Sequence, residues 1–251
     1  MKKTILITGG TGKIGQVLTK HFLKKDYKVI ITSRNEQQAL KLFANSKNIP
    51  NLSVIEIDLR ADKAINHVIS SLEKLNAKPY ALIHCARNLE SLKYSPDLET
   101  RIKNWQAEYL LDVVIPYELS LAVAKMKESK LTNVVTISSM YGVVAANPHL
   151  YTNPQIQSPV QYSVAKAALI HATKEMAIRL SPQKIKVNCI SYGGIEGRAD
   201  EDFKKRYGKL CPIGRMLTEE EIIKPVEFLI SNSSTAMQGH NLIVDGGWSI
   251  W

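Results

Sequence analysis

The sequence predicts an α/β protein: a single doubly wound domain with a central parallel sheet flanked by helices. Short, β-branched apolar runs alternate along the chain with longer amphipathic stretches. Uninterrupted apolar strands with helices between them are typical of a parallel sheet covered on both faces. The length of 251 residues and the apolar share of 45% suit one large core. No linker or repeat divides the chain, so residues 1–251 are predicted to form one domain.

The strands are predicted at the short apolar runs 4–7, 29–31, 53–57, 81–83, 134–137, 185–190 and 242–244. After the first run, Ile14, Val17, Leu18 and Phe22 recur at helical spacing. Further helical patterns lie around residues 62–75, 99–128, 160–180 and 218–231. Strands and helices therefore alternate over the whole length of the chain.

Composition narrows the class of protein. The net charge of +10 comes from lysines scattered along the chain, without interleaved aromatic residues. This favours a solvated basic surface that attracts anions over a nucleic-acid binder, so we expect no nucleic-acid partner. The three cysteines lie far apart and the six histidines show no ligand spacing. Neither a disulfide framework nor a metal site is predicted.

The sequence contains no membrane or export signal. No apolar run approaches the roughly 18 residues that would span a bilayer. The apolar run after Met1-Lys2-Lys3 is shorter than the core of about 7–15 residues that a signal peptide needs. We therefore expect a cytoplasmic protein with no membrane partner.

A glycine-rich turn, Thr8 to Gly15, follows the first predicted strand and leads into a helix. Glycine lets the backbone approach a pyrophosphate closely, and a helix N-terminus offers unpaired N–H groups to that anion. The turn therefore predicts a dinucleotide site. Its candidate contacts are Gly9, Thr11, Gly12, Lys13 and Ile14.

The end of the second strand indicates which dinucleotide is preferred. An acid there binds the ribose hydroxyls of NAD, whereas a cation receives the 2′-phosphate of NADP. Here the strand runs into Ser33 and Arg34, and Lys13 is expected to add a second positive charge. NADP is predicted, with NAD as the alternative if Arg34 only decorates the surface.

A tyrosine and a lysine one helical turn apart form the candidate catalytic pair. Tyr162 and Lys166 open a predicted helix and share one of its faces. A nearby ammonium lowers the pKa of a phenol and makes its proton transferable at neutral pH. The strand before this helix ends in Ser139, whose hydroxyl can bind the substrate oxygen. The alternative is a Tyr/Lys pair that only packs.

In order along the chain, these motifs resemble the short-chain dehydrogenase/reductase family. The resemblance covers nearly the whole chain. It also includes Asp58-Leu59, Val187 to Ile190, Pro212 to Arg215 and Asp245 to Gly247. It implies a Rossmann domain with a seven-stranded sheet and reversible hydride transfer between a nicotinamide and an alcohol or ketone. Dimers or tetramers form in this family through helices at 99–128 and 160–180, although the alanines of 160–180 also suit packing on the chain's own sheet.

The resemblance assigns a role to each matching residue. Ser139 orients the substrate, Tyr162 is the acid/base, and Lys166 lowers the pKa of Tyr162 and binds the nicotinamide ribose. Asp58 and Leu59 flank the adenine, and Ile195 presents its backbone N–H to the carboxamide. Cys85 and Ala86 stand in the cofactor-side segment after the fourth strand.

The chain departs from the family pattern at several positions. His84 to Arg87 replaces the usual Asn-Asn-Ala-Gly, and Tyr192 replaces a proline. Asp112 stands where a catalytic asparagine is expected; an aspartate there can organise a water and take up its proton. The loop 140–161 is longer than usual and is predicted to shape the substrate pocket, and the charged segment 196–217 is predicted to be a mobile lid.

Several segments are similar to a bacterial subgroup linked to flagellin and surface-sugar modification. This likeness implies a sugar or sugar-phosphate substrate, for which Arg87, Arg198 and Arg215 are candidate phosphate contacts or surface residues. The competing hypothesis is a dinucleotide-binding sensor or scaffold with little catalytic power. The changes at Asp112 and at 84–87 favour the sensor, while Ser139, Tyr162 and Lys166 favour the enzyme.

Overall fold

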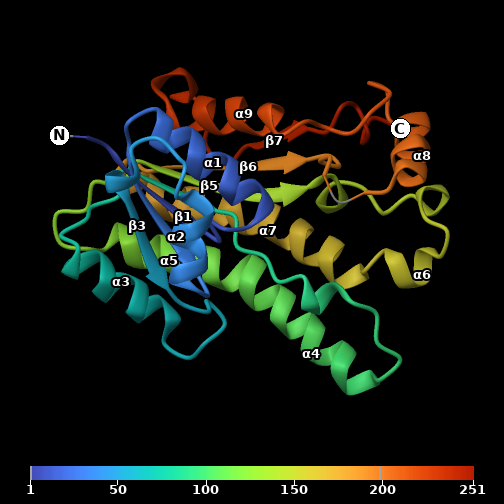
Figure 1. The fold of residues 1–251 in the computed structure, drawn as a ribbon, viewed down its shortest axis with the longest axis horizontal. Helices are drawn as coiled ribbons and strands as arrows, with labels where there is room; N and C mark the ends of the chain where they lie inside the picture. Colours follow the sequence, from blue (N-terminus) through green and yellow to red (C-terminus); the bar gives the residue numbers. More distant parts are fainter. Residues whose placement is uncertain (1, 198) are drawn as a thin grey trace.

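The computed structural model describes residues 2–197 and 199–251. Over these residues a seven-stranded sheet runs in the order β3-β2-β1-β4-β5-β6-β7, and every neighbouring pair is parallel (Figure 1). Every predicted strand is present. The bounds are β1 Thr4–Thr8, β2 Lys28–Ser33, β3 Leu52–Glu56, β4 Ala81–His84, β5 Asn133–Ser139, β6 Lys186–Tyr192 and β7 Asn241–Val244. The predicted α/β class with a central parallel sheet is confirmed.

Helices cover both faces of the sheet. One apolar cluster packs α1 (Lys13–Lys24), α2 (Glu36–Phe43) and α9 (Glu220–Ile230) on one face. A second packs α3 (Ala64–Lys74), α5 (Ile115–Ala124) and α7 (Val160–Leu180) on the other (Figure 1). The two clusters together enclose the sheet, which is the doubly wound arrangement that the alternating pattern predicts.

The stretch predicted as one helical pattern around 99–128 is interrupted. It consists of α4 (Leu98–Tyr109), a π-helical turn at Leu110–Val114 and α5. Pro116 lies in the first turn of α5, where its missing N–H costs little. The π turn carries Asp112, and π turns of this kind often lie at functional sites.

Two helices lie where no helix was predicted. The side chain of Asn35 caps α2, and that of Asp200 caps α8 (Glu201–Leu210) by accepting the N–H of Phe203 at 2.8 Å. Both caps are visible in the sequence, but α2 is only eight residues long and α8 is mostly charged, so neither shows a long apolar pattern. A short helix, α6 (Pro154–Gln157), lies in the loop between β5 and α7.

The order of the strands in the sheet indicates where a ligand would bind. β1 lies between β2 and β4, so the chain crosses over in opposite directions on either side of it. Ligands of such sheets bind beyond the carboxyl ends of the strands at this point. Among the described residues, no helix is both long and apolar enough to cross a membrane.

Candidate active site

A cavity of about 820 Å³ opens at the carboxyl ends of the strands. Its volume lies in the range of small-molecule and cofactor sites, about 300–1,000 Å³. Most of the sequence-predicted site residues line it, from both halves of the chain. They are Gly9, Thr11, Gly12, Lys13, Ile14, Ser33, Arg34, Asp58, Leu59, Cys85, Ala86, Ser139, Tyr162 and Ile195. Lys166 and Asp112 lie behind this wall, both buried.

The turn between β1 and α1 packs too closely for side chains. Gly9 has φ +65°, and a Cβ there would lie 2.5 Å from the Cα of Ala86. Gly12 is the N-cap of α1, and no side chain caps this end or places an acid in its first turn. The N–H groups of the first turn are therefore free of a capping carboxylate. This end of the helix fits an anionic pyrophosphate.

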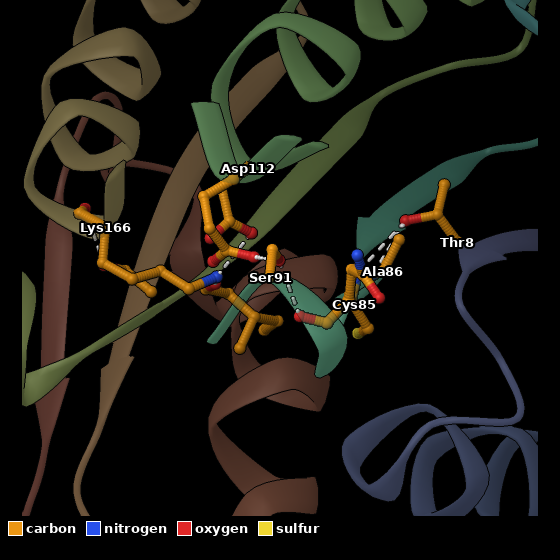
Figure 2. Close-up of polar contacts among 10 residues, drawn as sticks. Thr8, Cys85, Ala86, Ser91, Asp112 and Lys166 are labelled. Carbon is orange, nitrogen blue, oxygen red and sulfur yellow. Dashed lines mark hydrogen bonds and ion pairs between the residues drawn. The ribbon is translucent and has the colours of Figure 1, made fainter. Parts of the chain in front are cut away.

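The backbone after β4 is tied to β1. The N–H of Cys85 donates to the carbonyl and to the hydroxyl oxygen of Thr8, both at 3.2 Å, and the N–H of Ala86 lies 3.3 Å from that hydroxyl (Figure 2). The amide hydrogens of Cys85 and Ala86 are therefore directed at Thr8, which fixes this backbone segment. Gly9 packs against it.

Two arginines stand at the β2 and β3 end of the cavity. Arg34 is exposed, while the Ser33 hydroxyl takes part in a local turn with Asn35. Arg60, which sequence reasoning missed, lines the same cavity and binds the Asp58 carboxylate with two nitrogens, at 2.7 and 3.0 Å. This hydrogen bonding holds the pKa of Asp58 below its usual value. The sequence signal for this ion pair was an acid and an arginine two residues apart, directly after a predicted strand.

Lys13 joins two segments that line the cavity. Its ammonium donates to the carbonyl of Ile195 at 2.6 Å and so joins the glycine turn to the segment after β6. Ile195 forms an isolated bridge to Leu217 that uses the N–H groups of Leu217 and Glu196. The N–H of Ile195 itself takes no part in that ladder. Because Lys13 and Arg34 line the same cavity, the second charge beside Arg34 stays a prediction.

Ser139 and Tyr162 come from neighbouring elements. Ser139 ends β5, and its oxygen accepts the N–H of Tyr141 at 3.2 Å, so the hydroxyl hydrogen stays available as a donor. Tyr162 lies in the first turn of α7. The guanidinium carbon of Arg87 lies 4.5 Å from the centre of its ring, and the Lys166 nitrogen lies 5.7 Å away. Two cations therefore lie close to the phenol ring.

Lys166 forms a buried ion pair with Asp112. Its ammonium donates to Asp112 Oδ1 at 2.9 Å and to the carbonyl of Ile137 at 3.0 Å (Figure 2). Burial lowers the pKa of Lys166, but the Asp112 carboxylate and Tyr162 together outweigh burial and the net pKa is raised. Asp112 therefore contacts the lysine directly, where a bound water was expected. The ribose contact of Lys166 stays a prediction.

A second carboxyl, Glu108, lies beside this pair, and sequence reasoning missed it. It is 1% exposed and bonds the Ser91 hydroxyl through Oε1. Burial and the nearby Asp112 raise its pKa. Glu108 Oε2 and Asp112 Oδ2 are both buried without a hydrogen-bond partner. The signal in the sequence was the four-residue spacing of two acids on one helix.

The two segments predicted to shape the substrate side do meet at the cavity. Tyr141 and Tyr151 from the 140–161 loop share a hydrogen bond of 2.6 Å between their hydroxyls. From 196–217, Phe203 and Tyr207 also line the cavity, and Tyr207 stacks on Trp248 at 4.5 Å. This wall is largely aromatic. The predicted mobility of 196–217 stays a prediction.

Comparison with known proteins gives one consistent family. Residues 11–249 match the family model described as enoyl-(acyl carrier protein) reductase. The post-translational flagellin modification protein A of Campylobacter coli is 26% identical, over 99% of this chain and 98% of that protein.

Two solved structures share the fold and carry dinucleotides. A short chain dehydrogenase from Leptospira borgpetersenii with bound NAD+ is 29% identical, with a TM-score of 0.84, over 99% of this chain and 93% of that one. ElxO with NADP bound is 25% identical, with a TM-score of 0.83, and each chain is covered completely. The chain therefore belongs to the short-chain dehydrogenase/reductase family of NAD(P)-dependent oxidoreductases.

Proposed function

We propose that the protein interconverts an alcohol and a carbonyl compound, with Tyr162 as the acid/base and Ser139 orienting the substrate oxygen. One observation carries this proposal: Tyr162 and Ser139 line the same cavity as the glycine turn. A nicotinamide dinucleotide supplies or accepts the hydride when it is bound. In reduction, Ser139 donates a hydrogen bond to the substrate oxygen and Tyr162 gives that oxygen its proton. Lys166, kept cationic by Asp112, stabilises the phenolate that remains.

The preferred dinucleotide is NADP(H), with NAD(H) as the alternative. Solved relatives hold either form, so the family does not decide. Arg34 is exposed at the end of β2, where the 2′-phosphate of NADP lies in this fold. Arg60 lines the same end of the cavity, but two of its nitrogens already bind the Asp58 carboxylate. The planar, multi-donor guanidinium of Arg34 suits a phosphate better than a ribose hydroxyl.

The substrate is proposed to be an anionic sugar, such as a sugar phosphate of surface-glycan synthesis. Arg87 lines the cavity, and its guanidinium lies over the Tyr162 ring. It can therefore bind an anionic group close to the reacting carbonyl. Arg215 instead binds Glu221 at 2.8 and 2.9 Å, and Arg198 lies outside the described residues. The name of the Campylobacter relative supports a role in modifying flagellin.

The test measures NADPH consumption on keto-sugars and their phosphates. We expect turnover that favours the phosphates, and Arg87→Met should abolish that preference, because it removes the cation beside Tyr162. Arg215→Met is the matched control and should keep the preference. NADPH binding without turnover on every carbonyl compound tried would instead support the sensor hypothesis.

We also propose that the chain forms a homodimer or homotetramer. α4 and α7 expose a run of large apolar side chains: Leu98, Ile102, Trp105, Tyr109, Val160 and Val164. Packing against a second copy would bury this face, although Ala165 of α7 packs inward. Light scattering is expected to give at least twice the mass of one chain, and a strict monomer at micromolar concentration would contradict the proposal.

A further inference from the structure

The network behind Tyr162 contains one more acid than the ion pair requires. Glu108, Asp112 and Lys166 are 1%, 3% and 6% exposed, so all three are largely shielded from water. Glu108 and Asp112 are four residues apart on one helical run, and each leaves a buried oxygen without a partner. One buried ammonium therefore faces two carboxyls.

The contacts of the Ser91 hydroxyl allow Glu108 to carry a proton. The Ser91 hydroxyl contacts the backbone carbonyl of Asn88 at 3.1 Å and Glu108 Oε1. A hydroxyl has one hydrogen to donate, and a carbonyl oxygen only accepts. If Ser91 donates to Asn88, Glu108 must donate to Ser91, which requires a protonated acid. Both contacts are then satisfied.

The surrounding charges support the same state. Burial and Asp112 on its own helical run raise the pKa of Glu108, while the Ser91 hydroxyl, Lys166 from α7 and Arg87 from the loop after β4 lower it, and the net direction is upward. Arg87 is exposed to water, so its charge is screened. If both carboxyls were ionised, the buried group would carry an excess negative charge. Retaining one proton avoids that cost.

Building on the proposed function, we propose that Glu108 and Asp112 form a buried carboxyl pair that holds one exchangeable proton behind Lys166. When Tyr162 gives its proton to the substrate, Lys166 restores the phenol and becomes an amine. The pair then gives its proton to that amine through Asp112, whose Oδ1 lies 2.9 Å from the Lys166 nitrogen: an O–H bond of the pair breaks as an N–H bond of Lys166 forms, and Glu108 is left ionised. No electrons move in these steps. The pair, now doubly ionised, takes back a proton from water after turnover.

Glu108 acts through Lys166, so it is a positioning residue for the proton. The network also reaches the first turn of α7, because Gln161, next to Tyr162, donates its side-chain amide to the carbonyl of Ser91 at 2.8 Å. The carboxyl pair is therefore linked to Tyr162 in two ways, through Lys166 and through the hydrogen bond of Gln161 to Ser91.

Infrared spectroscopy of the free protein tests the proposal without any turnover. At neutral pH we expect the carbonyl band of a protonated carboxylic acid that Glu108→Gln removes and the exposed control Glu99→Gln keeps. Asp112→Asn should also remove the band, because Glu108 must then ionise to pair with Lys166. A band that persists in Asp112→Asn, or a wild-type protein with no such band, overturns the proposal.

Kinetics supply the second readout. Glu108→Gln keeps the shape of the acid but cannot release a proton, so we expect kcat for reduction to fall about tenfold with KM unchanged. In the wild type, kcat should fall at alkaline pH, where the carboxyl pair loses its proton. This fall should disappear in Glu108→Gln, which has no such proton to lose. Identical pH profiles for the variant and the wild type contradict the relay. If no carbonyl compound is turned over, the proposed function fails, and the infrared result still decides the state of the pair.

Discussion

The two halves of the cavity are built by different means. In the half formed by β1, α1 and β2, backbone geometry makes the site: Gly9 packs on Ala86, and the bare N-cap of α1 faces the cavity. In the half formed by β5 and α7, buried side-chain charge makes it, through Lys166 and Asp112. The glycine turn does not tolerate an added side chain, whereas the buried ion pair does not tolerate the loss of one charge. The predictions below test this contrast.

The largest effect is expected from Tyr162→Phe. Removing one oxygen leaves the ring close to Arg87 and Lys166, so packing and cofactor affinity should be unchanged. The substrate oxygen then has no proton donor, and kcat should fall about a thousandfold. Stopped-flow measurement of NADPH oxidation, with NADPH affinity determined separately, checks the separation. If kcat falls less than tenfold, another group supplies the proton.

Arg34→Asp should change the binding half alone. The variant loses a charge-assisted contact to the 2′-phosphate and places a carboxylate there, so the Kd for NADPH should rise by roughly tenfold to a hundredfold. The Kd for NADH should change little or fall. Isothermal titration with both dinucleotides measures the ratio. Equal changes for both would show that Arg34 is only a surface residue.

Sequence patterns located the first half of the cavity better than the second. The glycine turn and the strands follow from local spacing, so their positions could be predicted, including Arg34 at the end of β2. The pairing of Lys166 with Asp112 joins residues 54 apart, and its distance depends on how α7 packs on the π turn. The identity of Asp112 was visible in the sequence, but its direct contact was not. Glu108 resembles any helical acid until its burial is known.

His84 is expected to make stability depend on pH. It is fully buried, and burial lowers its pKa from 6.5 to about 3. Between these values the unfolded chain binds a proton that the folded chain does not, so stability is complete above pH 6.5 and falls as the pH decreases. The loss due to His84 is about 1.4 kcal/mol per pH unit in this window.

The check is urea unfolding of His84→Asn across the acid range. The amide cannot titrate, although it is too short to reach the Ser120 hydroxyl, which lies 2.9 Å from the Nε2 of the histidine. The pH slope of the free energy of unfolding should therefore be shallower than in the wild type. His67→Asn, on the exposed face of α3, should retain the wild-type slope. A slope unchanged in His84→Asn would assign the acid sensitivity to other groups.

The smallest effect is expected at the wall of the substrate half. The Tyr207 hydroxyl accepts the N–H of Gly194 at 2.9 Å, and the ring stacks on Trp248. Tyr207→Phe keeps the stacking but leaves that N–H without its acceptor, so the free energy of unfolding should drop by about 1 kcal/mol. Because Gly194 lines the cavity beside Ile195, KM for the carbonyl substrate should rise while NADPH affinity, set by the glycine turn, stays constant. Tyr94→Phe, at an exposed ring, serves as the control. Equal losses of substrate and NADPH affinity would mean that the two halves of the cavity are coupled through the segment after β6. Lys13→Met, which removes the hydrogen bond to the carbonyl of Ile195, would then test whether this contact carries the coupling.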